Sequence, residues 1–261
     1  MKRIIILILI FSSFQVLANG INRDTTKTEI QIYKNGQVKS IIIYKNNLLD
    51  GKVLRYYKNG TLQEKGKYKE NIPAGKWMKY YENGKLKSES SFKNGILNGK
   101  YVFYYENGNK QFIEKYNMET RVGEWKYWYE SGSLKELQYY DNQKKTGTWI
   151  SYYEDGTKWG EWTYVNSKKD GIWKEWYPNG NIKQETNYET NKQQGLTTRY
   201  FENGNIAEET NFVDHEKEGE WKKYYPNGQV SMIGFYKKSS TKTGTWKYFD
   251  EEGKLVKTEE Y

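Results

Sequence analysis

The side chains that could carry out acid and base chemistry are few. The chain of 261 residues contains a single histidine, His215, and no cysteine. Glu208, Glu209 and Asp214 stand close to this histidine in the sequence and could be combined with it into a metal or proton-transfer site. The neighbouring copies of the repeat described below lack the histidine. We therefore interpret these four residues as part of a solvated polar loop.

Other catalytic arrangements are missing from the sequence. Without cysteine there is no thiol nucleophile, no disulfide and no Cys-ligated metal site, and a single histidine excludes any mechanism that needs two. There is no Gly-x-Ser-x-Gly elbow and no phosphate-binding glycine motif that leads into a helix. We expect a protein that is not an enzyme, with no catalytic residues, no metal site and no cofactor.

Aromatic side chains are the abundant chemical groups of this chain. It contains 26 Tyr, 10 Trp and 9 Phe, and 17% of its residues are aromatic, but only 36% are hydrophobic. Globular domains usually reach about 45 to 50%, so a conventional two-layer core is undersupplied. Disordered chains are poor in aromatic residues, which excludes disorder. The rings suit a sheet that holds itself together, or binds a partner, through aromatic contacts.

The sequence repeats every 24 residues. One glycine recurs at this spacing, with a last step of 25 residues, and a second glycine follows the first after 15 residues, or 16 in the last copy. Both series indicate one array of about ten copies rather than several domains. The first series is Gly36, Gly60, Gly84, Gly108, Gly132, Gly156, Gly180, Gly204, Gly228 and Gly253, and the second is Gly51, Gly75, Gly99, Gly123, Gly147, Gly171, Gly195, Gly219 and Gly244.

Two aromatic positions keep step with the glycines. The eighth residue after each first-series glycine is Tyr or Phe in all ten copies. The second residue after each second-series glycine is Trp in most copies, with Val53, Tyr101 and Thr197 as exceptions. The eighth-position aromatics are Tyr44, Tyr68, Phe92, Tyr116, Tyr140, Tyr164, Tyr188, Phe212, Tyr236 and Tyr261, and the tryptophans are Trp77, Trp125, Trp149, Trp173, Trp221 and Trp246.

Each copy has the pattern of a β-hairpin. Residues 85–92 alternate apolar and polar side chains, and residues 100–105 are rich in β-branched and aromatic ones, as is typical of strands. Asn-Gly pairs join the two kinds of strand. Pro178 and Pro226 favour a three-residue loop, a type I turn followed by a glycine bulge, because proline cannot donate the amide that closes a two-residue loop. The sequence predicts an all-β fold, an elongated single-layer antiparallel sheet of about ten 24-residue hairpin repeats.

The turn register predicts a binding face. A three-residue loop followed by regular pairing places Leu86 and Phe92 on one face of the sheet and Trp77 and Tyr81 on the other. The eighth-position aromatics would hold the strands together, while the Trp side mixes rings with Lys and Glu and would bind the ligand. The alternative is that each Trp only stacks on its neighbours. The predicted binding residues are Trp77, Tyr81, Trp125, Tyr129, Trp149, Tyr153, Trp173, Tyr177, Trp221 and Tyr225.

Fragments of the chain resemble a known repeat. Residues 80–87 read Tyr-Tyr-Glu-Asn-Gly-Lys-Leu-Lys, and residues 92–101 read Phe-Lys-Asn-Gly-Ile-Leu-Asn-Gly-Lys-Tyr. Both resemble the variant form of the MORN repeat, and the resemblance covers residues 30–261 in ten in-phase copies. It implies an elongated, twisted, single-layer antiparallel sheet that acts as a binding platform. Bacterial proteins that look like this are often labelled as antitoxin components of toxin–antitoxin pairs.

The first residues do not follow the repeat. Lys2 and Arg3 precede an apolar run over residues 4–11, and a Val-Leu-Ala site ends at Ala18, which predicts a secretory signal peptide cleaved after Ala18. A retained membrane anchor is the alternative, although the run is short for a bilayer. We therefore expect an exported protein, which is periplasmic, secreted or at the cell surface. The predicted division is a signal peptide over 1–18, a short linker over 19–29 and the array over 30–261.

Charge and composition narrow the class of partner. The formal net charge is +9, but lysines are interleaved with glutamates and form no basic block, so we expect no nucleic acid. Leu and Ile are too sparse for a membrane-inserting face, so membrane binding is disfavoured. The leading hypothesis is an exported repeat scaffold that binds a protein partner through an aromatic-rich sheet face. The alternatives are cell-wall or glycan binding by the same face, because rings also stack on sugars, and antitoxin- or immunity-like neutralisation of a partner toxin.

Overall fold

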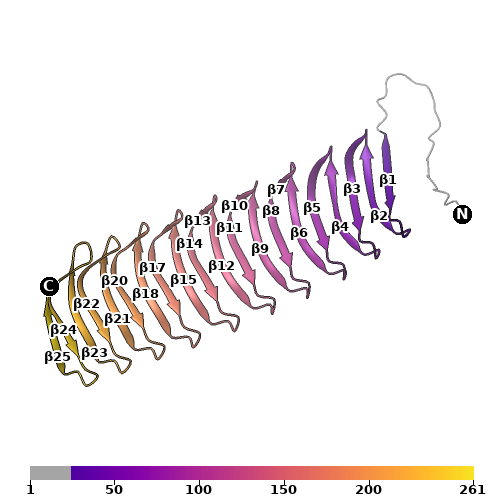
Figure 1. Ribbon diagram of the computed structural model, residues 1–261. Helices are drawn as coiled ribbons and strands as arrows, with labels where there is room; N and C mark the ends of the chain where they lie inside the picture. The colour runs from indigo at the N-terminus through magenta and orange to yellow at the C-terminus, as the bar shows by residue number, and fades with distance from the viewer. Residues whose placement is uncertain (1–24) are drawn as a thin grey trace, which may run out of the picture.

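The structure is a computed structural model that describes residues 25–261 (Figure 1). These residues form one antiparallel sheet of 25 strands and contain no helix, which confirms the predicted fold. The predicted signal peptide lies outside the described residues. The strands are β1 (Thr26–Ile32), β2 (Val38–Lys45), β3 (Leu48–Tyr56), β4 (Leu62–Lys69), β5 (Ile72–Tyr80), β6 (Leu86–Lys93), β7 (Ile96–Leu97), β8 (Gly99–Tyr104), β9 (Lys110–Asn117), β10 (Thr120–Arg121), β11 (Gly123–Trp128), β12 (Leu134–Asp141), β13 (Lys144–Lys145), β14 (Gly147–Tyr152), β15 (Lys158–Val165), β16 (Lys168–Lys169), β17 (Gly171–Trp176), β18 (Ile182–Glu189), β19 (Lys192–Gln193), β20 (Gly195–Tyr200), β21 (Ile206–Val213), β22 (Glu216–Tyr224), β23 (Val230–Lys237), β24 (Thr241–Phe249) and β25 (Leu255–Glu260).

Strands lie side by side in the order in which the chain visits them. Each hairpin pairs with the next, as β3 pairs with β4 and β4 with β5. The short strands are the first parts of interrupted strands, since β7 and β8 both pair with β6. Figure 1 shows a single layer that runs from the indigo end to the yellow end, with no second layer over it. β1 begins at Thr26, inside the segment predicted as a linker.

The turns that contain the first-series glycines are three-residue loops, as predicted. In the turn between β5 and β6, the Gly84 amide donates to the Tyr81 carbonyl at 2.9 Å, and the Tyr81 amide donates to the Lys85 carbonyl at 2.9 Å. Gly84 has a φ of 84°, the left-handed conformation that this turn requires of its last residue. The loop is therefore Glu82, Asn83 and Gly84.

A second irregularity follows every one of these turns and was not predicted. Tyr80 pairs with Leu86, but Lys79 pairs with Ser88, so that Lys87 is an extra residue in a β-bulge. The same register shift occurs in all ten hairpins. Because one extra residue reverses which side chains share a face, Trp77 lies on the same face as Phe92. The predicted separation of the tryptophans from the eighth-position aromatics is therefore wrong.

The two faces of the sheet differ in how they are filled. We call the face that carries Trp77, Trp125, Trp149 and the eighth-position aromatics the Trp face, and the other one the opposite face. On the Trp face, rings from successive strands contact one another without a break from Tyr116 to Tyr188. The centroid distances are 5.2 Å for Tyr116 and Trp125, 4.9 Å for Trp125 and Tyr140, 5.3 Å for Tyr140 and Trp149, 5.2 Å for Trp149 and Tyr164, 5.4 Å for Tyr164 and Trp173, and 5.0 Å for Trp173 and Tyr188.

This aromatic ladder is the core of the molecule. Trp125, Tyr140 and Trp149 are only 3%, 7% and 5% exposed, although no second layer covers them. Each ring is covered by the rings of the neighbouring strands, so burial depends on the next repeat being present. The ladder stops where Thr197 replaces the tryptophan, and resumes with Trp221, Tyr236 and Trp246.

Candidate functional site

The predicted binding tryptophans are packed inside the Trp face. Trp77, Trp125, Trp149 and Trp221 are at most 9% exposed, and Trp173 is half-buried. Their indole N–H groups are mostly used within the sheet. Trp125 donates to the Lys115 carbonyl at 3.2 Å, Trp149 to the Tyr139 carbonyl at 3.1 Å, Trp173 to the Thr163 carbonyl at 3.1 Å, and Trp221 to the Glu208 carboxylate at 2.7 Å. These contacts are those of a sheet core.

The predicted binding tyrosines connect adjacent repeats. Each hydroxyl donates to a backbone carbonyl about one repeat further along the chain, which fixes one turn against the next. Sequence reasoning missed this role, although a tyrosine three residues before the turn glycine in most copies was its signal. The bonds are Tyr81 to Tyr104 at 2.6 Å, Tyr129 to Tyr152 at 2.8 Å, Tyr153 to Trp176 at 3.2 Å, Tyr177 to Tyr200 at 2.8 Å, and Tyr225 to Phe249 at 2.8 Å.

Lysines cover several rings of the ladder. The Lys145 ammonium lies 4.3 Å from the Trp149 ring centroid, Lys169 lies 4.2 Å from Trp173, and Lys242 lies 4.2 Å from Trp246. These cation–π contacts stabilise the packed rings and reduce their access to a partner. Binding by the ten predicted residues stays a prediction, and the structure shows them engaged in holding the repeats together.

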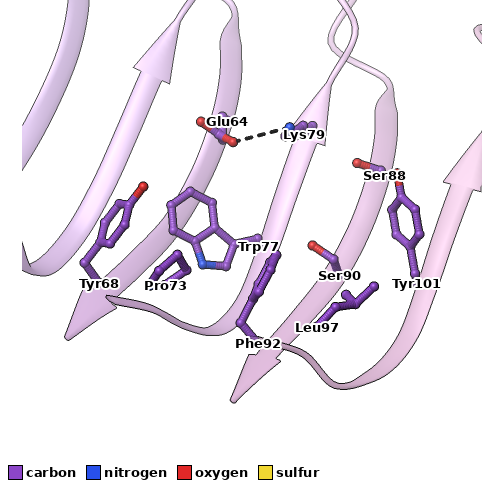
Figure 2. A pocket seen from close by; sticks show the side chains of 10 residues that line it. All are labelled: Glu64, Tyr68, Pro73, Trp77, Lys79, Ser88, Ser90, Phe92, Leu97 and Tyr101. Atoms are coloured by element: carbon purple, nitrogen blue, oxygen red, sulfur yellow. Dashed lines mark ion pairs between the residues drawn. The ribbon is translucent and has the colours of Figure 1, made fainter. Parts of the chain in front are cut away.

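A hollow opens on the Trp face beside Trp77 (Figure 2). It encloses about 330 Å³. Figure 2 shows the Trp77 ring between Tyr68 and Phe92, with Ser90 and Tyr101 on the side of Phe92. The small side chains of Ser88 and Ser90 leave space beside Trp77 that larger residues fill in other repeats. The lining residues are Glu64, Tyr68, Pro73, Trp77, Lys79, Ser88, Ser90, Phe92, Leu97 and Tyr101.

The packing of Trp77 explains the hollow. A Cβ atom at Gly66 would lie 2.2 Å from Trp77 Cδ2, so the ring lies directly over this glycine and away from Ser90. In this position the buried Trp77 Nε1 has no hydrogen-bond partner among residues 25–261. The rim is polar, because the Lys79 ammonium lies 3.8 Å from the Glu64 carboxylate. The hollow could receive a flat or apolar group with polar groups at its edge.

The acidic residues near His215 do not converge. The Glu208 carboxylate lies on the Trp face, where Trp221 and Thr210 donate to it, while Glu209 lies on the opposite face. Burial opposes ionisation of Glu208, but these hydrogen bonds and the charges of Arg199 and Lys217 outweigh it and lower its pKa. Within residues 25–261 no three Asp, Glu or His side chains are placed to share a metal ion.

Asp214 and His215 instead form a two-residue loop at the edge of the sheet. Both have positive φ values, 53° and 74°, and Lys192 donates to the Asp214 carboxylate at 2.8 Å. The hydrogen bond and charge of Lys192 lower the pKa of Asp214. The arrangement is that of a turn tied to its neighbouring repeat. In the described part of the chain no helix is long and apolar enough to span a bilayer.

The opposite face exposes apolar side chains in its C-terminal half. Ile172 on β17, Leu196 on β20 and Phe235 on β23 are 56%, 54% and 42% exposed. Leu196 also borders a hollow of about 370 Å³ whose other walls are polar. Those walls are Glu209, Asn211, Glu220 and Lys222. We call Ile172, Leu196 and Phe235 the apolar patch.

Comparison with known proteins gives a family and distant structural similarities. No curated protein matches the chain. A crystal structure of TcdB2-TccC3 matches 88% of this chain and 17% of that chain, with 10% identity and a TM-score of 0.23. A Tc holotoxin pore from Photorhabdus luminescens with a mutated TccC3 matches 90% of this chain and 16% of that chain, with 11% identity and a TM-score of 0.22. The chain therefore spans less than a fifth of the length of these solved chains.

The family match follows the repeats. A family model described as the MORN repeat variant matches ten segments, which cover residues 26–46, 49–70, 74–94, 97–118, 121–142, 145–166, 169–190, 193–214, 217–238 and 242–261. Each matched segment contains one three-residue turn together with residues of the two strands that flank it, in phase with the ladder of rings. The chain belongs to the MORN repeat variant family.

Proposed function

We propose that this chain is an exported repeat scaffold that binds a protein partner, and that the partner lies on the opposite face. The observation that carries the proposal is the apolar patch, because Ile172, Leu196 and Phe235 remain about half exposed while the rings of the Trp face are buried. Apolar side chains that gather on one face among polar neighbours mark protein interaction sites, and these three lie on the same face of three consecutive hairpins. The hollow beside Leu196 offers a recess for a partner side chain.

Site-specific crosslinking tests which face contacts the partner. A photocrosslinking residue is placed at Leu196 on the opposite face and, in a second variant, at Lys223, which is exposed on the Trp face. The same crosslinked protein should appear with the Leu196 variant and be absent with the Lys223 variant. Equal crosslinking from both positions would contradict the choice of face.

Substitution then tests the energetic role of the patch. Leu196→Ser and Phe235→Ser should each weaken binding of the crosslinked partner about tenfold or more, as expected for anchors at the centre of an interface. Val256→Ser is the matched control, since Val256 is 61% exposed on the edge strand β25 and lies outside the patch. An unchanged affinity for both patch variants would overturn the proposal.

A second candidate function is glycan binding in the hollow beside Trp77. Its walls combine aromatic rings with the hydroxyl-bearing side chains of Ser88, Ser90 and Tyr101, which is suitable for a sugar ring. Ser90→Leu would fill the hollow without touching the opposite face. Loss of binding to purified cell-wall polymer in this variant would support the glycan function, and no binding by the unmodified protein would exclude it.

Export is part of the main proposal and has its own test. Cleavage after Ala18 would give a mature chain that begins at Asn19. Mass spectrometry of the native protein from the extracytoplasmic fraction should find this N-terminus. Peptides that contain Met1 in that fraction would contradict cleavage.

A further inference from the structure

The N-terminal half of the opposite face is strongly basic. Lys52 and Lys67 are direct cross-strand partners, and so are Lys100 and Lys115. Lys76 projects from β5 between them, and Lys65 lies two residues from Lys67 on β4. All six side chains are exposed. We call this set the lysine row: Lys52, Lys65, Lys67, Lys76, Lys100 and Lys115.

The lysine row forms no ion pair within the sheet, although Glu89 lies on the same face and accepts a hydrogen bond from the Tyr104 hydroxyl. Among residues 25–261 no ion pair involves any of its six members. Lysines further along the same face do have partners, as Lys126 lies 2.6 Å from Glu124 and Lys174 lies 2.6 Å from Glu185. In the N-terminal half, Lys69 on the same face lies 2.7 Å from Asp50, so the fold neutralises lysines beside the row but not the members of the row.

This distribution is unfavourable for the isolated sheet. Like charges that face each other directly across two strands destabilise the pair. Two such pairs, Lys52 with Lys67 and Lys100 with Lys115, occur within six neighbouring long strands. An acidic residue at one member of each pair would remove the repulsion without changing the core, because these side chains point away from the Trp face. A bound anionic partner would compensate the charge in the same way.

A second row on the same face indicates what kind of anion fits. Leu54, Met78, Val102 and Ile113 are half-buried, and each lies two residues along its strand from a lysine of the row. In the register of the sheet Lys65 stands between Leu54 and Met78, and Glu89 stands between Met78 and Val102. Two residues of a strand span about 7 Å, so the basic row runs next to a row whose apolar members are Leu54, Met78, Val102 and Ile113 and whose charged members are Lys65 and Glu89. We call the four apolar members the apolar row. A nucleic acid or a polyanionic glycan would use the charges and leave the apolar row uncovered. A polypeptide can match both rows.

We infer that the lysine row and the adjacent apolar row bind a polypeptide segment that is acidic along one side and apolar along the other. This inference rests on the proposed protein-binding function and adds the chemistry of the partner. The acidic side chains of the segment would pair with Lys52, Lys67, Lys76, Lys100 and Lys115. Its apolar side chains would cover Leu54, Met78, Val102 and Ile113. Exposed lysines give attraction and orientation, while the apolar row gives contact area.

Binding of a synthetic peptide tests the inference. The probe is a fluorescent amphipathic peptide with Glu along one side and Leu along the other, measured by fluorescence anisotropy against the full chain. Neutralising Lys52, Lys67 and Lys76 together by Lys→Gln should weaken binding at least tenfold. The control neutralises Lys144, Lys168 and Lys238, which are exposed elsewhere and give the same net charge. It should change the affinity by no more than about twofold.

Two matched probes separate this inference from other anionic ligands. A peptide with Leu replaced by Gln should bind at least tenfold more weakly than the amphipathic peptide. A single-stranded oligonucleotide and an anionic vesicle should also bind more weakly than the amphipathic peptide. Equal binding of the oligonucleotide, of the vesicle or of the Leu-free peptide would overturn the inference, and so would an unchanged affinity of the triple variant. Circular dichroism and the unfolding midpoint confirm that the variants are folded.

The tests of the proposed function and of this inference fail in different ways. The proposed function fails when Leu196 and Phe235 do not contribute to binding of the crosslinked partner. The inference fails when the lysine row does not contribute to peptide binding, even if the apolar patch does. The two sets of residues lie on different strands, so each set of variants leaves the other surface intact.

Discussion

At the scale of single residues, a glycine on the neighbouring strand decides how a tryptophan packs. Trp77 lies over Gly66 and Trp246 lies over Gly234, where an added Cβ would come within 2.2 Å and 2.3 Å of the ring. In both cases the indole Nε1 is buried without a partner. Trp149, which faces a longer side chain, donates its N–H to the Tyr139 carbonyl instead. The same repeat position therefore has two packing modes.

Gly66→Ala should destabilise the protein. The new methyl group would overlap the Trp77 ring, which cannot move freely between Tyr68 and Phe92, and overpacking of this kind costs about 1–3 kcal/mol. Urea unfolding midpoints measure the loss. Ser90→Ala is the control, because Ser90 is the direct cross-strand partner of Trp77 and already has a Cβ. If both variants unfold at the midpoint of the unmodified protein, the ring does not occupy this position.

Glu208 should make the stability depend on pH. Its pKa in the folded protein is lowered, because hydrogen bonds from Trp221 and Thr210 and the nearby cations outweigh its burial. A lowered pKa means that the stabilisation is present above the usual carboxyl pKa of about 4.3 and is lost as the pH falls through the folded value. Unfolding midpoints between about pH 6 and pH 3 should therefore fall less for Glu208→Gln than for Glu130→Gln, an exposed control. Parallel pH profiles would contradict this role.

At the scale of the hairpin, the turn and the bulge together set the faces. The three-residue turn was predicted from Pro178 and Pro226 and is confirmed. The bulge three residues after each turn glycine was missed, and it reverses the alternation along the rest of the strand. Proline and glycine mark a turn through their backbone requirements, whereas a bulge between two ordinary residues has no such signal. The array was therefore predictable, and the face of each side chain was not.

Deleting a single residue of β12 should destabilise the protein to a different extent at two positions. Without the bulge residue Lys135, Leu134 still pairs with Trp128, Glu136 with Tyr127 and Gly123 with Tyr140, so all rings stay on the Trp face. Deletion of Gln138 would turn Tyr140 to the opposite face and break its contacts with Trp125 and Trp149. We expect the second deletion to cost at least about 3 kcal/mol more than the first, by analogy with loss of a buried aromatic side chain.

Unfolding midpoints and tryptophan fluorescence measure both deletions. The Lys135 deletion should keep the emission of buried tryptophan, while the Gln138 deletion should shift it toward that of exposed tryptophan. Equal destabilisation by the two deletions would show that the bulge itself, rather than the face of Tyr140, is what the hairpin requires.

The candidate site was less predictable than the fold. The spacing of Trp77 and Trp149 correctly indicated regular rows of rings, but their roles depend on which strand lies next to them and at what register. The lysine row was hidden for the same reason. Lys52 and Lys67 are 15 residues apart and look interleaved with glutamates in the sequence, and only the strand register places them opposite each other.

At the scale of the whole molecule, stability comes from contacts between neighbouring repeats. Each repeat covers one side of the next ring, so the free energy of unfolding should be a sum of terms for single repeats and for adjacent pairs. The contributions of the repeats to this sum are unequal, because Thr197 interrupts the aromatic ladder. Thr186, Thr197 and Thr210 fill this part of the Trp face with small buried side chains in place of a ring.

Truncation of the array should reveal this unevenness. Three shortened chains are compared, ending at Phe212, Tyr188 and Tyr164. Going from Phe212 to Tyr188 removes β20 and β21, the hairpin that contains Thr197 and adds no ring to the ladder. Going from Tyr188 to Tyr164 removes β17 and β18, and with them the contacts of Trp173 with Tyr164 and Tyr188.

The second step should therefore lower the unfolding midpoint more than the first. Each aromatic pair contributes about 0.5–1.5 kcal/mol beyond its buried area. The second step removes three such pairs, those of Trp173 with Trp162, Tyr164 and Tyr188, together with the cation–π contact of Lys169 with Trp173. The dependence of the free energy on denaturant should decrease in both steps, since less surface is exposed on unfolding. Guanidinium titrations followed by circular dichroism give both quantities. Two equal steps would mean that hairpins contribute alike whether or not they carry a tryptophan, and a constant midpoint would mean that the repeats unfold independently of their neighbours.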